Sequence, residues 1–402
     1  QLVVIRHKGR YHEQFQIGFH LRYIILPSFG CLIVVSRRLT VRNTTSYSLA
    51  SRYFDASADS MINPANPTDR NTTHVEYLDG WRGLAIFTLL IGHFFPVPGI
   101  NFGTVGVNLF FVLSGLLMGG LLFEKKEPIS RFYRRRVARI VPAHATFIFL
   151  ITISYFALDL PFSFVEFASA LLFINNYIPP TDGPGNALMP FGHIWSLSVE
   201  EHSYVILSIV AIVSRRRLFS SSSAIGLLVI ASASCAVYYQ WLNPPKLAFS
   251  EWLHTEVAAY GLLCTAFWVS SGRPMPSRFT SHSLAPILLI TGIVLHWWST
   301  PLVIQQLIGV LCFVGAICVL STTKGWFASA LSWSPLRKLG LWSYSLYLWQ
   351  QPFYLWSHSE QGPSAWIALC AALFCGLISY YFVEQPVRIY LNTNWKTRRR
   401  DS

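Results

Sequence analysis

The sequence predicts an all-α integral membrane protein with about ten transmembrane helices and both termini in the cytoplasm. Hydrophobic residues make up 52% of the 402 residues, and only 12% are charged, against about 25% in a soluble domain. A mean hydropathy of +0.42 argues against a disordered chain, which needs low hydrophobicity. The net charge of +13 does not indicate nucleic-acid binding, because such proteins spread basic residues over a soluble face.

The apolar segments and basic clusters together give the number of spans. Segments near the usual span length of about 20 residues occur at 83–98, 103–123, 141–160, 164–178, 194–213, 224–242, 253–270, 284–299, 302–322, 341–356 and 364–383. Segment 164–178 is the weakest, because it contains Asn175-Asn176 and runs into Pro179-Pro180. If it does not span, every basic cluster after Met61 lies in the cytoplasm, where basic loops are normally found. We therefore expect ten helices, with 164–178 as a re-entrant or interfacial piece outside.

The N-terminal 60 residues differ from the rest. Their single apolar stretch, Tyr23 to Val35, is too short to span a bilayer comfortably. The first methionine is Met61, so we expect translation to start at or near it and 1–60 to be a non-native or disordered extension. A cytoplasmic leader at 61–75, a membrane domain at 76–390 and a basic cytoplasmic tail at 391–402 would follow.

The seven cysteines form no C-x-x-C pair. Most lie in apolar runs, and their number is odd, so neither a disulfide framework nor a zinc site is indicated. No other residue pattern requires a cation, and no metal is predicted.

Arg82 and His93 are the first candidates for chemistry. They are eleven residues apart, about three helical turns, so they share one helix face about 16 Å apart. Arg82 is expected near the cytoplasmic boundary and His93 well inside the membrane, where an ionisable residue tends to be functional. Neutral imidazole can take a proton from a hydroxyl near pH 7. The alternatives are an interhelical hydrogen bond for His93 and helix N-capping for nearby Asp79.

Polar residues recur in three later segments. Asn108 and Ser114 lie in Gly106-Val-Asn-Leu-Phe-Phe-Val-Leu-Ser-Gly115, where they either face a cavity or belong to a closely packed helix. The segment Arg131 to Arg139 contains Arg135, Arg136 and Arg139. These arginines either set orientation and bind lipid headgroups or bind donor phosphates.

The third segment carries Glu200 and Glu201, which open an apolar helix expected on the outer side. Acidic residues are favoured at a helix N-terminus, but this pair could also orient His93 or contact a polar acceptor. Tyr344, in Trp342-Ser-Tyr-Ser-Leu-Tyr-Leu-Trp-Gln350-Gln-Pro352, and the Glu384-Gln-Pro386 ending complete the set. Aromatic residues at helix ends are often interface anchors.

Taken in order, these motifs resemble the acyltransferase-3 family of integral membrane acyltransferases. The matching motifs run over about residues 76–390 and read L-D-G-W-R-G with a histidine eleven residues after the arginine, G-V-N-L-F-F-V-L-S-G, F-Y-R-R-R-V-A-R-I-V-P, W-S-L-S-V-E-E, S-Y-S-L-Y-L-W-Q and E-Q-P. The resemblance implies ten helices and an acyl-CoA donor, acetyl-CoA above all, that enters from the cytoplasm. It also implies a sugar hydroxyl as acceptor, on an envelope glycan or a small glycosylated product.

By this resemblance His93 is the catalytic histidine and Arg82 its essential partner. Arg136 and Arg139, with Arg135 beside them, belong to the family's basic loop and are expected to contact the donor phosphates. Two positions depart from the family: Asn108 stands where Asp or Gln is frequent, and Gln350 stands where His is common, so no proton-transfer role is assigned to Gln350. Some members carry a C-terminal hydrolase-like extension that this sequence lacks, so we expect either the membrane domain alone or a separate envelope partner protein to complete the acceptor chemistry.

The predicted function is therefore acyl transfer from acyl-CoA to a glycan hydroxyl in the bacterial inner membrane, with His93 as general base either directly on the acceptor or in a relay across the membrane. The alternative from another class is a transporter or flippase of an envelope lipid-linked saccharide, because buried polar residues and broken helices suit transporters too. A third interpretation is a membrane-embedded sensor or scaffold.

Overall fold

The computed structural model describes residues 75–178, 188–217, 219–242, 251–273, 275–276, 281–322 and 325–397. All of them belong to the second of the two units into which the chain divides, Gln1–Tyr47 and Ser48–Ser402. The predicted extension 1–60, the leader up to residue 74 and the tail from residue 398 lie outside the described residues, so the predictions made for them stay predictions.

The described part of the chain is helical, and its only β contact is an isolated bridge between Ile100 and Trp297. The elements of its first half are α2 (Glu76–Phe94), α3 (Phe102–Gly119), η1 (Gly120–Glu124), α4 (Ile129–Ala157), α5 (Phe164–Leu171), η3 (Gly192–Ile194), α6 (Trp195–Arg215) and α7 (Ser221–Leu242). Those of its second half are η4 (Glu251–Leu253), α8 (Thr255–Ala258), α9 (Tyr260–Ser271), α10 (Leu284–Leu295), α11 (Leu302–Ile304), η6 (Gln305–Gly309), α12 (Val310–Leu320), α13 (Trp326–Leu331), α14 (Ser334–Ser357), α15 (Ala365–Ser379), η7 (Tyr380–Glu384) and α16 (Gln385–Thr397).

Six helical stretches within the described residues are long and apolar enough to cross a membrane. They are Phe102–Glu124, Ile129–Ala157, Gly192–Arg215, Ser221–Trp241, Leu302–Leu320 and Ala365–Thr393. This confirms the prediction of an all-α membrane protein at that level. The segment 164–178 contains only the eight-residue α5, about 12 Å long, which is too short to cross a hydrocarbon core of about 30 Å. The short helix agrees with our leaving this segment out of the spans.

Helix ends in the first hairpin place His93 beside α3. α2 ends at Phe94, shortly before Pro96 and Pro98, which lack the backbone N–H that a continuing helix needs. α3 begins after Asn101, whose side-chain oxygen accepts a hydrogen bond from the Thr104 amide at 3.1 Å, a normal N-cap contact. The turn between the two helices leaves His93 in the last turn of α2, facing the start of α3.

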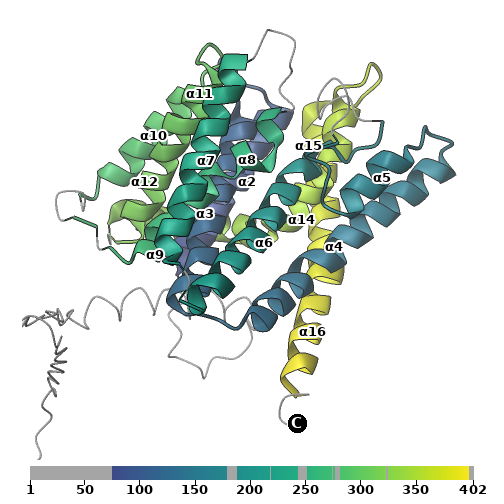
Figure 1. The fold of residues 1–402 in the computed structure, drawn as a ribbon. Coiled ribbons are helices and arrows are strands. Elements are labelled where there is room, and N and C mark those ends of the chain that lie inside the picture. The colour runs from purple at the N-terminus through teal and green to yellow at the C-terminus, as the bar shows by residue number, and fades with distance from the viewer. Residues whose placement is uncertain are drawn as a thin grey trace, which may run out of the picture. The chain divides into compact units, whose positions relative to one another are not determined.

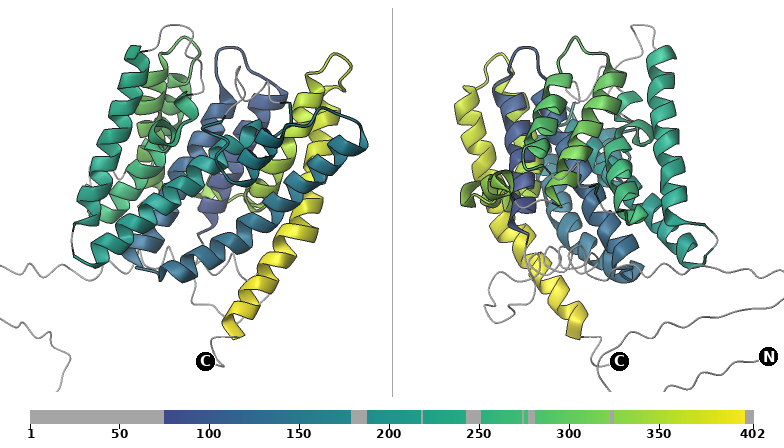
Figure 2. Two further views of the ribbon diagram at one scale, coloured as in Figure 1. Left: turned by 45° about the vertical axis from the view of Figure 1, so that its right-hand side comes forward. Right: turned by 90° about the vertical axis from the view of Figure 1, so that its left-hand side faces the viewer.

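The site is built around α2, α3 and α14 (Figure 1). α14 packs along α2 and α15, α2 packs along α3, and α3 packs along α9. α3 is the central helix. The most apolar part of the stretch Phe102–Glu124 is 83% buried, against 17% for Ser221–Trp241, which belongs to α7. α16 continues past the ends of its neighbours in both orientations of Figure 2.

Glycines permit the closest helix contacts around α2. A Cβ on Gly340 of α14 would lie 1.9 Å from the Asp79 carbonyl oxygen, and one on Gly106 of α3 would lie 2.7 Å from that of Ala85. Small residues allow transmembrane helices to approach in this way. The packing interpretation of the glycine pattern around Gly106 is therefore confirmed.

Candidate functional site

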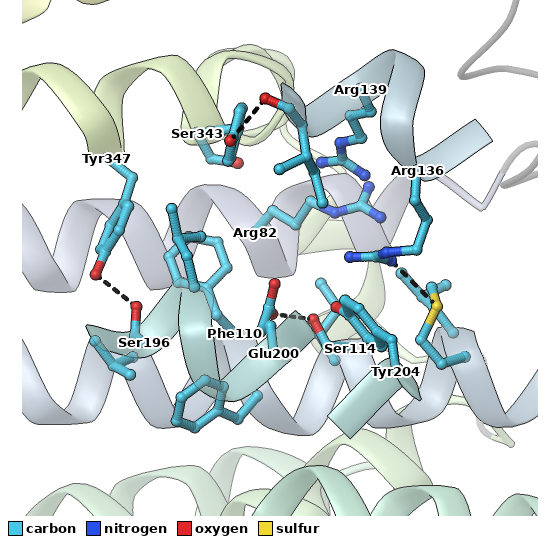
Figure 3. A pocket seen from close by; sticks show the side chains of 18 residues that line it. Arg82, Phe110, Ser114, Arg136, Arg139, Ser196, Glu200, Tyr204, Ser343 and Tyr347 are labelled. Atoms are coloured by element: carbon cyan, nitrogen blue, oxygen red, sulfur yellow. Dashed lines mark hydrogen bonds between the residues drawn. The ribbon is translucent and has the colours of Figure 1, made fainter. Parts of the chain in front are cut away.

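A cavity of about 760 Å³, part of it open, lies among α2, α3, α4, α6 and α14 (Figure 3). The residues lining it are Arg82, Val107, Phe110, Phe111, Leu113, Ser114, Leu117, Met118, Arg136, Arg139, Ile140, Ser196, Leu197, Glu200, Tyr204, Ser343, Tyr344 and Tyr347. Figure 3 shows the guanidinium groups of Arg82, Arg136 and Arg139 gathered at one end, and Tyr347 with Ser196 at the other. The cavity thus brings together residues that are distant in the sequence.

The basic segment that supplies two of these arginines is helical. We expected a loop after the family pattern, but residues 131–139 form the first turns of α4, which runs unbroken through Pro142. Arg136 and Arg139 are three residues apart and therefore share a helix face. Arg135 lies on another face, where its Nη1 is 3.2 Å from Glu127 Oε1, and it does not line the cavity. Of the three arginines expected to contact the donor, Arg136 and Arg139 line the cavity and Arg135 does not.

Arg82 reaches the cavity from α2. Its Nη1 donates to Asp79 Oδ1 at 2.8 Å, and both side chains are buried. Asp79 therefore pairs with Arg82 and is not the N-cap of α2, a position that Val75 occupies. Arg82 Nη2 is buried without a hydrogen-bond partner among the described residues. Because buried N–H groups are nearly always paired, this nitrogen is available to an acceptor in the cavity.

Arg136 enters the cavity from α4 and lies over an aromatic ring. Its guanidinium carbon is 3.3 Å from the centroid of Tyr204, a cation–π contact. Nη2 lies 3.5 Å from Glu201 Oε1, and Nη1 donates to Met118 Sδ at 3.2 Å. Arg136 Nε is buried without a partner in the described chain. Arg82 and Arg136 therefore each keep a free N–H in this region.

The acidic pair of α6 lies beside the arginines. Glu200 lines the cavity and accepts a hydrogen bond from Ser114 of α3, while Glu201 contacts Arg136. We expected this pair to open an apolar helix on the outer side. α6 begins five residues earlier, at Trp195, and Glu200 lines the same cavity as Arg82, while the side of the membrane stays a prediction. Ser114, for which we left open a cavity or a packing role, lines the cavity.

The other α3 candidate, Asn108, lies elsewhere. Its Nδ2 is 3.1 Å from His296 Nε2, and His296 Nδ1 is 2.7 Å from the Gly292 carbonyl oxygen. Both side chains are buried, and neither lines the cavity. With Nδ1 donating to the carbonyl and Nε2 accepting from the amide, all polar atoms of this histidine are satisfied. Asn108 therefore joins α3 to α10.

Tyrosines of α14 close the cavity. Tyr344 donates to the Ile140 carbonyl oxygen at 3.1 Å, which ties α14 to α4. Tyr347 donates to the His193 carbonyl oxygen at 2.5 Å, so its oxygen is the acceptor for Ser196, 2.6 Å away. The bonds of Tyr347 lie at the end of the cavity farthest from the arginines (Figure 3), whereas Tyr344 is tied to the residue next to Arg139.

His93 lies outside the cavity, near the opposite end of α2 from Arg82. Its Nδ1 is 2.7 Å from Gln350 Oε1, and its ring stacks on Tyr354 with centroids 4.6 Å apart. Gln350 Nε2 donates to Gln351 Oε1 at 3.2 Å, which identifies Oε1 as the atom that faces His93. An amide oxygen only accepts, so Nδ1 carries the proton and Nε2 keeps its lone pair.

The free nitrogen of His93 faces the start of α3. A Cβ placed on Gly103 would lie 3.1 Å from His93 Nε2, so glycine keeps this approach open. His93 is partly exposed. The arrangement supplies a basic nitrogen that a ligand can reach.

Sequence reasoning missed two residues in this region, Gln350 and His193. Gln350 was noted only as a departure from a family pattern, although an amide at that position can bind a histidine one helix away. His193 stands directly before the W-S-L-S motif and carried no spacing signal. Among the described residues, no group of three or more His, Cys, Asp or Glu side chains is placed to hold a metal ion.

Comparisons with known proteins identify the family of this chain. The model of the acyltransferase-3 family, described as an acyltransferase domain, matches residues 75–385. YrhL of Bacillus subtilis is 28% identical over 358 residues, which cover 79% of this chain and 56% of YrhL. Two further relatives are the O-acetyltransferase OatA of Staphylococcus aureus, 25% identical over 77% of this chain and 57% of OatA, and the peptidoglycan O-acetyltransferase OatA of Listeria monocytogenes, 24% identical over 78% and 56%.

The chain thus spans little more than half the length of these curated relatives. No solved structure matches it significantly. The family model covers well over half of the chain, and its span includes every candidate residue described above. The chain belongs to the acyltransferase-3 family.

Proposed function

We propose that this protein is a membrane O-acyltransferase that moves an acetyl group from acetyl-CoA to a hydroxyl of an envelope glycan. Peptidoglycan is the acceptor class that the name of the Listeria relative suggests. The observation that carries the proposal is that α2 joins a cluster of arginines, to which it contributes Arg82, with a histidine whose Nε2 is free. Arg82 and His93 provide the two ends of that arrangement on α2.

The arginine end suits the phosphates of the donor. Asp79, Glu200 and Glu201 offset much of the charge of the three arginines, so net charge alone does not identify a ligand. The unpartnered Arg82 Nη2 and Arg136 Nε point to a phosphate ligand. Phosphate oxygens accept charge-assisted hydrogen bonds from guanidinium groups. In this proposal Arg82, Arg136 and Arg139 hold the phosphates, and the cavity admits the adjoining part of the donor.

The histidine end suits general base catalysis. His93 Nε2 takes the proton of the acceptor hydroxyl as the hydroxyl oxygen attacks the thioester carbonyl carbon. The carbon–sulfur bond then breaks, and the protonated imidazole returns its proton to the departing thiolate. Gln350 holds the imidazole in the tautomer that this step needs, so it acts as a positioning residue.

The two ends are separated along the membrane normal in this proposal. Eleven residues of α2 correspond to about 16 Å, half of the hydrocarbon thickness. The donor then enters from the cytoplasmic side, and the acceptor meets His93 toward the outer side. We place residues 76–390 as the membrane domain, in the bacterial cytoplasmic membrane, with a separate envelope protein as a candidate partner.

The described helices support ten crossings. The six apolar stretches are joined by α2, the α8–α9 pair, α10 and α14, which lie between or beside them in the fold. The short α5 is not needed as a span. This count keeps both chain ends in the cytoplasm, as the basic clusters require.

His93→Ala tests the proposal. Removing a general base typically costs 10²-fold to 10⁴-fold in rate, so purified variant protein in detergent should transfer little labelled acetyl from acetyl-CoA to muropeptides. His282→Ala, at an exposed histidine, is the matched control and should keep full activity. Full transfer by His93→Ala would refute the role of His93. Absence of thioester consumption by the unaltered protein would instead favour a transporter.

A further inference from the structure

His193 is a buried histidine that the proposed mechanism does not yet use. It lies in η3 and is 4% exposed. Neither Nδ1 nor Nε2 has a hydrogen-bond partner of good geometry among the described residues, although the backbone of Leu348 lies beside the ring. Leaving a buried polar group unpaired is costly. Such a group indicates a ligand or solvent partner.

The position of His193 is between the two ends of the proposed site. Its ring centroid lies 5.2 Å from that of Tyr347, and its carbonyl oxygen binds the Tyr347 hydroxyl, at the cavity wall farthest from the arginines. One turn further along α14, Gln350 binds His93. Phe147 closes the other side, with its ring centroid 5.6 Å from that of His193. His193 therefore lies between Tyr347, which lines the cavity, and the part of α14 that binds His93.

The chemistry of a neutral imidazole limits what it can recognise. It offers one N–H donor and one acceptor nitrogen, and a secondary amide offers one acceptor oxygen and one N–H donor. The two groups are therefore complementary. An acyl-CoA carries two such amides in the pantetheine arm, between its phosphates and its thioester.

We propose that His193 binds an amide of the pantetheine arm and so guides the thioester from the arginine cavity to His93. This inference rests on the proposed function, because it takes an acyl-CoA as the donor. The inference adds a donor-binding residue between the arginines and His93. The neighbouring hydroxyls of Ser196 and Tyr347 are already hydrogen-bonded to each other, and Phe147 has no polar group.

The test compares a donor that has the amides with one that lacks them. His193→Phe fills similar space but removes both nitrogens, whereas His193→Gln keeps one donor and one acceptor. Each variant is assayed for thiol release, in detergent and with muropeptides as acceptor, from acetyl-CoA and from ethyl thioacetate. Ethyl thioacetate has a thioester but neither phosphates nor amides.

We expect His193→Phe to raise KM for acetyl-CoA about 5-fold to 150-fold, because the variant loses both hydrogen bonds to the amide. Turnover of ethyl thioacetate should not change, and His193→Gln should restore most of the acetyl-CoA affinity. If the phenylalanine variant is not recovered folded, His193→Leu replaces it with the same expected result.

Equal losses with both donors, or no loss with acetyl-CoA, would overturn the inference, because a structural or solvent-binding histidine predicts no dependence on the donor. Failure of the unaltered protein to turn over acetyl-CoA is a different result, which refutes the proposed function and this inference with it.

Discussion

Replacing Gln350 by leucine tests whether one hydrogen bond sets the proton position on His93. The two atoms, His93 Nδ1 and Gln350 Oε1, are 2.7 Å apart, and Gln350 is fully buried. Leucine has a similar size but no acceptor. In Gln350→Leu the Nδ1 proton loses its partner, so the tautomer with the proton on Nε2 becomes more populated, and that tautomer cannot accept a proton from a hydroxyl.

The magnitude follows from the cost of the unpaired donor. A hydrogen bond contributes about 0.5–1.5 kcal/mol, and an unsatisfied buried donor costs about 1–3 kcal/mol. A shift of about 1–3 kcal/mol in the tautomer equilibrium corresponds to a loss of about 5-fold to 150-fold in kcat. KM for acetyl-CoA should stay within about twofold, because Gln350 does not line the cavity.

The assay is labelled-acetyl transfer to muropeptides under saturating donor, with kcat and donor KM determined separately. Gln350→Glu is the matched variant, because a carboxylate keeps the acceptor for Nδ1–H, and it should retain kcat within about fivefold. A leucine variant with unaltered kcat would refute the tautomer argument. Equal losses in the leucine and glutamate variants would also contradict it, since only one of them removes the acceptor.

Three further substitutions test other parts of the site. Arg136→Lys should raise donor KM by up to about 30-fold with little change in kcat, because lysine loses the stacked guanidinium geometry; an unchanged KM in donor titrations would contradict donor contact. Gly103→Ala should lower kcat at least tenfold, because its methyl group would lie 3.1 Å from His93 Nε2. Gly119→Ala, whose methyl group would lie equally close to a valine, should leave kcat unchanged. Equal kcat values in the two variants would contradict the argument that the acceptor reaches Nε2 past Gly103. Asn108→Ala should lower stability by about 1–3 kcal/mol in thermal unfolding with donor KM unchanged, and a selective KM effect would return Asn108 to the site.

The membrane class and most helices could be predicted from sequence because both depend on local properties. An apolar stretch of about 20 residues can satisfy its backbone inside a bilayer only as a helix. The same reasoning set aside segment 164–178, whose paired asparagines and prolines leave room for only the short α5. The sequence pattern did not predict that the basic segment 131–139 is helical. Helix α4 begins at Ile129, well before the apolar segment 141–160 from which we placed the span.

The candidate site was predicted only in part, for a geometric reason. Spacing on one helix is local, so the shared face of Arg82 and His93, and the i,i+3 relation of Arg136 and Arg139, could be derived. Which face meets which neighbour depends on packing between helices, and the sequence carries no direct signal of that.

The kind of protein, and several of the residues proposed for its chemistry, could thus be predicted from the sequence alone. Only the tertiary structure decided that Arg135 pairs with Glu127 while Arg136 enters the cavity, and that Glu201 lies beside Arg136 at the same end of the bundle. It likewise decided the role of Gln350, which reaches His93 across 257 positions of the chain. The physical reason is that helix periodicity fixes angles within a helix, whereas contacts between helices depend on where small residues such as Gly340 allow the backbones to approach.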